Sequence, residues 1–169
     1  RNFFKIEKNV EITLEANPGT ITYQWLASLR SLGFNRLSLG FQSLDDKELR
    51  LLGRIHSANQ AVEAYSWARQ AGFENINIDL IYGLPYQSFG QWQEILNRTL
   101  RLAPEHFSLY PLTLDETTPL GHAVESGSIP APDPDMAAEM YLWAEDCLAG
   151  AGYEHYELSN WSLPGNACR

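Results

Sequence analysis

The chain has 169 residues, of which 44% are hydrophobic and 12% aromatic, a composition typical of one globular domain rather than a disordered chain. Its formal net charge of −9 argues against a nucleic-acid backbone or an anionic membrane as partner, because both attract clustered Lys and Arg. No apolar run approaches the ~18 residues of a membrane span, so no integral membrane segment is expected.

Strand and helix patterns alternate from the beginning of the chain. Period-two alternation before turn residues is typical of a strand, and apolar residues three and four apart are typical of a helix. The elements expected in chain order are a strand at 10–18, a helix at 20–34, a strand at 36–43, a short helix at 43–53, a helix at 57–72, a strand at 74–85, a helix at 88–104, a strand at 106–114 and a helix at 133–153. Between the last two, residues 115–132 are rich in Gly and Pro and predict a long loop with one helical turn. At the end, YEHYELSN (153–160) predicts a fifth strand.

Serine and aspartate mark the expected helix starts. Ser57 and Ser88 are each followed three residues later by glutamine, the pattern of a capping box. Ser43 is expected to open the short helix, and Asp133 precedes a proline at the first position of the last helix. Strand–helix alternation predicts parallel strands joined by right-handed crossovers. The fold class is therefore α/β, a partial parallel βα (TIM-like) barrel, with an open doubly wound sheet as the alternative.

Cysteine content and the two ends give further expectations. Cys147 and Cys168 are the only cysteines, and two cysteines make neither a zinc site nor a disulfide framework. Few cysteines and no opening signal peptide favour the cytoplasm. The stretch RNFFKIEKN (1–9) is typical of the end of an amphipathic helix, and the chain stops after NACR without a closing element. We therefore expect a fragment truncated at both ends.

Each expected strand has a polar and an apolar face, because successive side chains point to opposite sides. The polar faces carry Glu11, Thr13 and Glu15; Ser38, Gly40 and Gln42; Asn75, Asn77 and Asp79; and His106, Ser108 and Tyr110. The apolar faces suit packing on helices, so the polar faces are expected to line the barrel interior and hold a polar ligand. A sheet face that meets water is the alternative.

Candidate site residues follow from the carboxyl ends of the strands, the edge at which βα barrels bind ligands. These ends carry Glu15, Gln42, Asp79 and Thr113. Arg54, just after the short helix, is suited to pair with a ligand carboxylate, a surface arginine being the alternative. Glu15 and Asp79 are also a candidate general acid–base pair. His56 is interpreted as a loop residue bonded to its own backbone.

Several motifs together carry a family resemblance that covers nearly the whole chain. In order they are EITLEANPGT, NRLSLGFQS, LGRIHSANQA, NINIDLIYGLP and GYEHYELSN. They resemble the radical S-adenosylmethionine (SAM) proteins related to oxygen-independent coproporphyrinogen III oxidase. GRIHS, the EANPGT turn and the YELSN ending followed by PG and CR resemble the heme chaperone branch of that family more than the true oxidase branch. The resemblance implies a partial βα barrel that holds a [4Fe-4S] cluster and SAM.

By matching motif, the resemblance also implies the roles of individual residues. Arg54 and Gln42 would serve the methionine carboxylate of SAM, Glu15 and Asp79 its ribose hydroxyls or ammonium, and Thr113 would lie near the adenine. The C-x-x-x-C-x-x-C loop that ligates the cluster is missing, as are the first strands and the H-N-x-x-Y-W segment of the C-terminal domain. The two cysteines of this chain do not replace that loop. No metal site and no radical chemistry are therefore expected of the chain itself.

The resemblance leaves more than one function open for the full-length protein. The first is a heme chaperone that delivers heme to respiratory enzymes, with SAM, the cluster and heme as ligands and a heme-acceptor protein as partner. The alternative is an enzyme that decarboxylates the propionates of coproporphyrinogen III, beginning with hydrogen abstraction at the propionate. A third reading is an unrelated small-molecule βα-barrel enzyme. The resemblance implies that residues 1–169 are a fragment of a radical SAM βα-barrel core, with the start of a C-terminal region at about 153–169.

Overall fold

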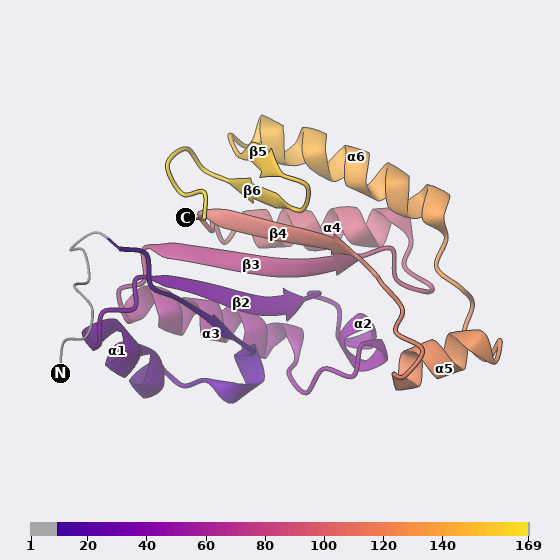
Figure 1. Ribbon diagram of the computed structural model, residues 1–169, viewed down its shortest axis with the longest axis horizontal. Coiled ribbons are helices and arrows are strands. Elements are labelled where there is room, and N and C mark those ends of the chain that lie inside the picture. Colours follow the sequence, from indigo (N-terminus) through magenta and orange to yellow (C-terminus); the bar gives the residue numbers. More distant parts are fainter. Residues whose placement is uncertain (1–9, 169) are drawn as a thin grey trace.

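A six-stranded sheet in the order β1-β2-β3-β4-β6-β5 runs through the molecule (Figure 1). The structure is a computed structural model that describes residues 10–168, so the expected helix end at 1–9 lies outside the described residues. The strands are β1 (Thr13–Ala16), β2 (Arg36–Gln42), β3 (Asn75–Tyr82), β4 (His106–Pro111), β5 (Glu154–Glu157) and β6 (Asn160–Ser162). The helices are η1 (Pro18–Thr20, a 3-10 turn), α1 (Tyr23–Ser31), α2 (Asp46–Leu51), α3 (Ala58–Gln70), α4 (Phe89–Leu100), α5 (Pro119–Glu125) and α6 (Pro134–Gly150).

The first four strands are parallel, as the alternation predicts, and the last two are not. β1, β2, β3 and β4 pair in parallel, whereas β6 is antiparallel to β4 and β5 is antiparallel to β6. The expected fifth strand at 153–160 is thus a hairpin of two strands. Only Leu158 and Ser159 separate β5 from β6, and a connection this short joins only antiparallel strands. The sheet is an open, partial barrel, which confirms the predicted fold class.

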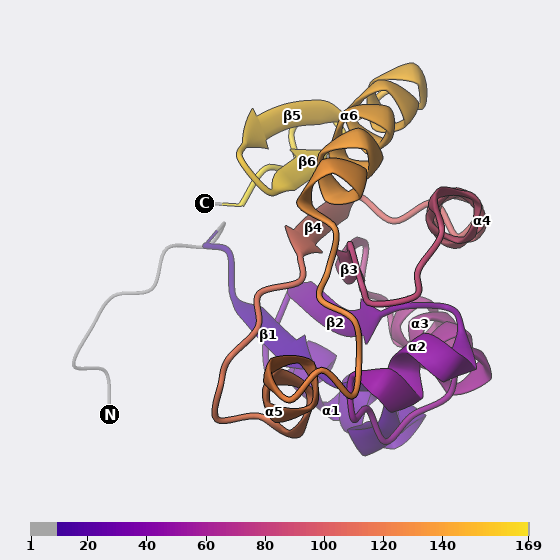
Figure 2. The ribbon, with the colours of Figure 1, turned by 90° about the vertical axis from the view of Figure 1, so that its right-hand side faces the viewer.

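The apolar faces of the central strands form the core. Viewed along the strands, the sheet is an open arc with α3, α4 and α6 around its outer side (Figure 2). The outward side chains of the strands are completely buried: Leu37, Leu39 and Phe41 in β2, Ile76, Ile78 and Leu80 in β3, and Phe107 and Leu109 in β4. The helices therefore cover the apolar face, and the polar face lines the inner side of the arc.

The expected helix caps hold with one correction. The Ser57 and Ser88 capping boxes are both present, and Asp133 caps α6. Ser43 does not cap α2: the Asp45 carboxylate accepts from the N–H groups of Lys47 and Glu48. The Ser43 hydroxyl instead donates to the Glu48 carboxylate at 2.6 Å, inside the protein.

The segment at 115–132 is also more helical than expected. It contains the seven-residue helix α5, whose first position is Pro119 and whose N-cap is Thr118. Proline at the first helical position is compatible with a helix, because its missing N–H has no partner there in any case. The predicted loop is present on both sides of α5, and the helix is longer than the single turn that was expected.

Candidate functional site

The polar side chains of the inner face form two rows that cross the sheet in register. One row pairs Glu15 with Ser38, Asn77, His106 and Ser162 on successive strands. The next row pairs Gly40 with Asp79, Ser108, Asn160 and Glu157. Parallel and antiparallel strands contribute to the same rows, so the hairpin β5–β6 extends the polar face. The alternative of a bare water-facing sheet does not describe it, since Ser38, Asn77, His106 and Ser108 are all buried.

Asp79 lies at the middle of this face, and polar side chains of neighbouring residues hold its carboxylate. Ser38 Oγ donates to Asp79 Oδ2 at 3.0 Å, and Asn77 Nδ2 donates to Asp79 Oδ1 at 2.7 Å. Burial raises the pKa of Asp79 above its usual value, hydrogen bonds from Ser38, Asn77 and Ser108 offset part of this, and the charge of Glu15 adds to it. The two carboxylates are thus close enough to interact. Both face the inner side of the sheet.

Asn77 joins Asp79 to the hairpin through His106. Asn77 Oδ1 lies 2.6 Å from His106 Nδ1, and His106 Nε2 lies 2.7 Å from the Tyr156 hydroxyl. An amide oxygen only accepts, so Nδ1 carries the proton and Nε2 accepts from Tyr156. Burial, and then the charge of Arg36, lower the pKa of His106 to about 4, so the imidazole is neutral at pH 7.

A second group of polar side chains gathers over Gly40 at the carboxyl ends of β1 and β2. Arg54 Nη1 donates to Asn17 Oδ1 at 3.2 Å. A Cβ added at Gly40 would lie 2.8 Å from Gln42 Nε2 and 3.3 Å from Asn17 Oδ1, so both amides reach the space that glycine leaves. The ladder between β2 and β3 shifts register between Gly40 and Gln42, and Gln42 has a φ of +66°. Such irregularities re-aim side chains and occur often at functional sites.

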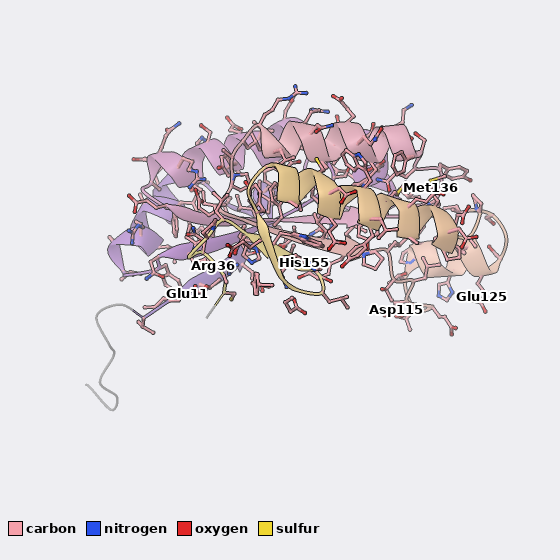
Figure 3. All side chains as sticks on the ribbon, turned by 90° about the horizontal axis from the view of Figure 1, so that it is seen from above. Glu11, Arg36, Asp115, Glu125, Met136 and His155 are labelled. Carbon is pink, nitrogen blue, oxygen red and sulfur yellow. The ribbon has the colours of Figure 1, made fainter. Side chains whose placement is uncertain are left out.

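The structure therefore brings four of the five predicted site residues to one region. Glu15 and Asp79 flank Ser38, and Gly40 pairs with Asp79 across β2 and β3. Arg54 bonds to Asn17, and the amides of Asn17 and Gln42 both lie beside Gly40. Thr113 is exposed and lines a separate cavity of about 500 Å³ at the same end of the strands, with Gly53, Leu112 and Asp115 among its neighbours. Figure 3 shows Arg36, where β2 begins, and Asp115, beyond the end of β4, on opposite sides of the centre of the molecule.

The interpretation of His56 as a loop residue bonded to its own backbone is wrong. His56 is buried, and its Nε2 lies 3.1 Å from the carbonyl oxygen of Phe41, in β2. His56 thus ties the loop that carries Arg54 to the strand that carries Gln42. Burial lowers the pKa of His56, the Phe41 carbonyl opposes this shift, and the charge of Arg54 adds to it.

Sequence reasoning did not single out three residues that contact the site. Asn17, Tyr156 and Asn160 contact Arg54, His106 and Ser108, respectively. Asn17 had a usable signal, because it follows directly after a strand in an Asn-Pro-Gly turn. The other two had none, since their contacts require the antiparallel hairpin.

Comparison with known proteins identifies the family. The family model described as Radical SAM superfamily matches residues 2–99, which is more than half of the chain. The chain belongs to the radical SAM superfamily. The resemblance predicted from the sequence motifs is thereby confirmed.

Relatives of this radical SAM chain carry two kinds of name. It is 45% identical over 155 residues to the Bos taurus protein named Radical S-adenosyl methionine domain-containing protein 1, mitochondrial, covering 92% of the chain and 35% of the relative. It is 36% identical over 169 residues to heme chaperone HemW of Mycobacterium tuberculosis (strain ATCC 25618 / H37Rv), covering 100% of the chain and 43% of the relative. Against HemW of Escherichia coli (strain K12) the identity is 36%, over 95% of the chain and 42% of the relative. The chain spans about two fifths of the length of these chaperones.

A solved structure supports the same placement. Coproporphyrinogen III oxidase (HemN) from Escherichia coli, described as a radical SAM enzyme, superposes with a TM-score of 0.85 at 28% identity, over 97% of the chain and 38% of that protein. The archaeal Elp3 from Methanocaldococcus infernus shares the fold with a TM-score of 0.73 at 23% identity, over 80% of the chain and 32% of that protein. The open barrel is therefore the one used by this superfamily.

The residues present fit SAM and do not fit the cluster. Two carboxylates, two amides and a guanidinium gather around Ser38 and Gly40, and the two amides reach the space that Gly40 leaves. These groups suit the ammonium, hydroxyl and carboxylate groups of SAM. For the cluster, residues 10–168 contain no group of three His, Cys, Asp or Glu side chains that could hold a metal ion. Within the same range, no helix is long and apolar enough to cross a membrane.

Proposed function

We propose that this chain is the SAM-binding part of a radical SAM heme chaperone. The observation that carries the proposal is that Asp79, Glu15, Gln42 and Arg54 lie in one region around Gly40. The chain is also 36% identical to proteins named heme chaperone. In this proposal the chain is one part of a barrel core, and the hairpin that begins after about residue 153 starts the C-terminal region.

The side chains have distinct roles in holding SAM. Arg54, steadied by Asn17, and the Gln42 amide would bind the methionine carboxylate, since a guanidinium and an amide both donate to carboxylates. Asp79 and Glu15 would accept from the ribose hydroxyls or the ammonium. Ser38 and Asn77 hold the Asp79 oxygens toward the inner face, so the carboxylate is oriented before the ligand arrives. Thr113 would contact the adenine end from the neighbouring cavity.

The chemistry of a radical SAM protein is supplied by SAM together with a [4Fe-4S] cluster, and this chain contributes the binding and orientation of SAM. Heme is the second proposed ligand, and a heme-acceptor protein is the proposed partner of the full-length protein. Heme comes from the names of the relatives, and the acceptor protein follows from the chaperone role that those names state. Cytoplasmic location stays a prediction, because the Bos taurus relative carries the word mitochondrial in its name.

The chaperone is favoured over the oxidase by the relatives. Proteins named heme chaperone are 35% and 36% identical to the chain, whereas the oxidase structure is 28% identical. The test is to incubate the cluster-reconstituted full-length protein with SAM and either coproporphyrinogen III or heme. Stoichiometric heme uptake without decarboxylation is expected. Formation of protoporphyrinogen would overturn the chaperone assignment, and failure to bind SAM would overturn the site.

A further inference from the structure

Glu48 is a buried carboxylate outside the SAM site. It connects the segment between Gln42 and Arg54 to the turn that follows β3. Glu48 lies in α2, between Gln42 and Arg54 in the sequence, and is only 6% exposed. It accepts from Ser43 Oγ at 2.6 Å and from Gln87 Nε2 at 3.1 Å and 3.2 Å. Among residues 10–168 no ion pair is found for Glu48. Each of these three hydrogen bonds comes from a neutral group.

Gln87 carries this connection into the turn that ends β3. Its side chain is also buried, and its Oε1 accepts from the N–H groups of Gly83 at 2.8 Å and Leu84 at 3.3 Å. The amide of Gln87 thus uses both ends: its nitrogen binds α2 and its oxygen binds the backbone just after the strand that carries Asp79. Gly83 has a φ of +70°, so the backbone held by Gln87 is itself a sharp turn.

This arrangement costs stability, which makes a role beyond packing worth testing. A carboxylate removed from water without a cation is unfavourable by several kcal/mol before its hydrogen bonds are counted. Burial raises the pKa of Glu48, hydrogen bonds from Ser43 and Gln87 oppose this shift, and the charge of Asp45 adds to it. An apolar pair would fill the same space at lower cost. A pair of complementary hydrogen-bonding groups, in contrast, fixes one relative position of the two loops.

We propose that Glu48 and Gln87 are positioning residues for the SAM site. Their hydrogen bonds set the segment that carries Gln42 and Arg54 at a fixed distance from the end of β3, so that these donors and Asp79 face the same ligand. This inference rests on the proposed function, since it concerns how well the site is preformed for SAM.

Reciprocal exchange of the two side chains gives a sharp test. Gln87→Glu places two carboxylates against each other in a buried place and should separate the loops. When Glu48→Gln is combined with Gln87→Glu, the new amide in α2 would accept from Ser43 and donate to the new carboxylate after β3. The other oxygen of that carboxylate would still accept from Gly83 and Leu84, so the hydrogen-bond pattern is restored with the charge on the other side. Glu63→Gln, at an exposed position of α3, is the matched control.

The readouts are the dissociation constant for SAM of the full-length, cluster-reconstituted protein and the hydrogen exchange of the Gly83 and Leu84 amides. Gln87→Glu should weaken SAM binding about tenfold or more, because small misplacements of binding groups are costly. The exchanged pair should return to within about twofold of the wild type, together with the protection of both amides.

The outcomes separate the positioning role from simple stability and from the proposed function. If Gln87→Glu binds SAM as the wild type does, the positioning role is wrong while the site stands. If Gln87→Glu fails to fold, the exchanged pair decides: recovery of folding without SAM affinity overturns the positioning role, and recovery of both supports it. If the wild type itself binds no SAM, the proposed function fails and this inference with it.

Discussion

Asp79 is a residue whose position serves binding better than stability. Its pKa is raised in the folded protein, chiefly by burial, so the folded state holds the proton more tightly than the unfolded chain does. Stability associated with Asp79 is therefore lost as the pH rises through the unfolded pKa of about 3.9 toward the folded value. The ionised form of this carboxylate is therefore a cost to folding. Binding sites commonly carry such costs.

Asp79→Asn should accordingly separate binding from stability. We expect the full-length variant to bind SAM about tenfold more weakly, because a charged acceptor is lost. We also expect its free energy of unfolding at pH 7 to be equal to or higher than that of the wild type, and the difference to shrink as the pH falls toward 4. Calorimetric titration with SAM and urea unfolding at two pH values would measure both. A variant that loses stability at pH 7 but keeps SAM affinity would contradict the assignment.

Hydrogen bonds between strands act at the scale of elements, and His106 is the point where three strands meet. It lies in β4 and contacts Asn77 in β3 and Tyr156 in β5. Its pKa is lowered from 6.5 to about 4 by burial and then by the charge of Arg36. The folded protein therefore binds fewer protons than the unfolded chain between these two pH values. Stability present above pH 6.5 is lost as the pH falls toward 4.

Replacing His106 with a non-titrating residue should flatten this pH dependence. From the shift, about 3 kcal/mol of stability depends on the neutral imidazole. The unfolding free energy of the wild type should thus fall more steeply between pH 6.5 and 4 than that of His106→Gln. His122→Gln, on the exposed surface of α5, is the control and should follow the wild type. Parallel curves for wild type and His106→Gln would show that the imidazole is not held neutral.

The elements that the sequence predicted are those governed by local pattern. Alternation correctly assigned the faces of β2, β3 and β4, and the Ser57 and Ser88 caps hold because they depend on residues three apart. Ser43 failed as a cap because Asp45 competes for the same N–H groups and Glu48 supplies Ser43 with a buried acceptor. The sequence predicted one strand where the hairpin of β5 and β6 lies, because these short strands carry no clear period.

The candidate site also combines features that local patterns predict with features that they do not. The sequence predicted that Glu15, Gln42 and Asp79 lie near one another because strand ends in a parallel sheet share one edge, and the strand pairing agrees with this placement. The position of Gln42 beside Gly40 depends on the register shift after Gly40, and the bond of Arg54 to Asn17 depends on the course of the loop after α2. Neither has a signature in single residues. The Glu48–Gln87 pair joins positions 39 apart in sequence, and no pattern along the chain indicates such a contact.

At the scale of the whole molecule, the open arc keeps two environments apart. The outer face and its helices form a dry core, and the inner face presents two polar rows. Changes in the core should therefore alter stability, and changes on the rows should alter binding. The tryptophans allow a clean test of the first half of this statement, because they differ strongly in exposure.

Trp92 joins three elements of the core. It is completely buried in α4, and its Nε1–H donates to the carbonyl oxygen of Met140 in α6 at 3.1 Å. The centroid of its ring lies 5.4 Å from the ring centroid of Tyr82 in β3. Trp25 lies on α1 and is 41% exposed, although the helical spacing of apolar residues there places it with the apolar set. The two side chains are chemically the same and differ in what they contact.

Trp92→Ala should cost about 3–5 kcal/mol of unfolding free energy, because it leaves a large cavity between α4, α6 and the sheet and removes the Nε1–H bond to Met140. Trp25→Ala should change it by about 0.5 kcal/mol or less, as at other exposed positions. Urea unfolding followed by circular dichroism measures both free energies. The loss for Trp92→Phe is expected to lie between them, because this variant keeps most of the side-chain volume and loses the N–H donor. Equal losses for Trp25→Ala and Trp92→Ala would mean that the layer of α4 and α6 does not share a core with the sheet. The division between a stabilising outer face and a binding inner face would then be wrong.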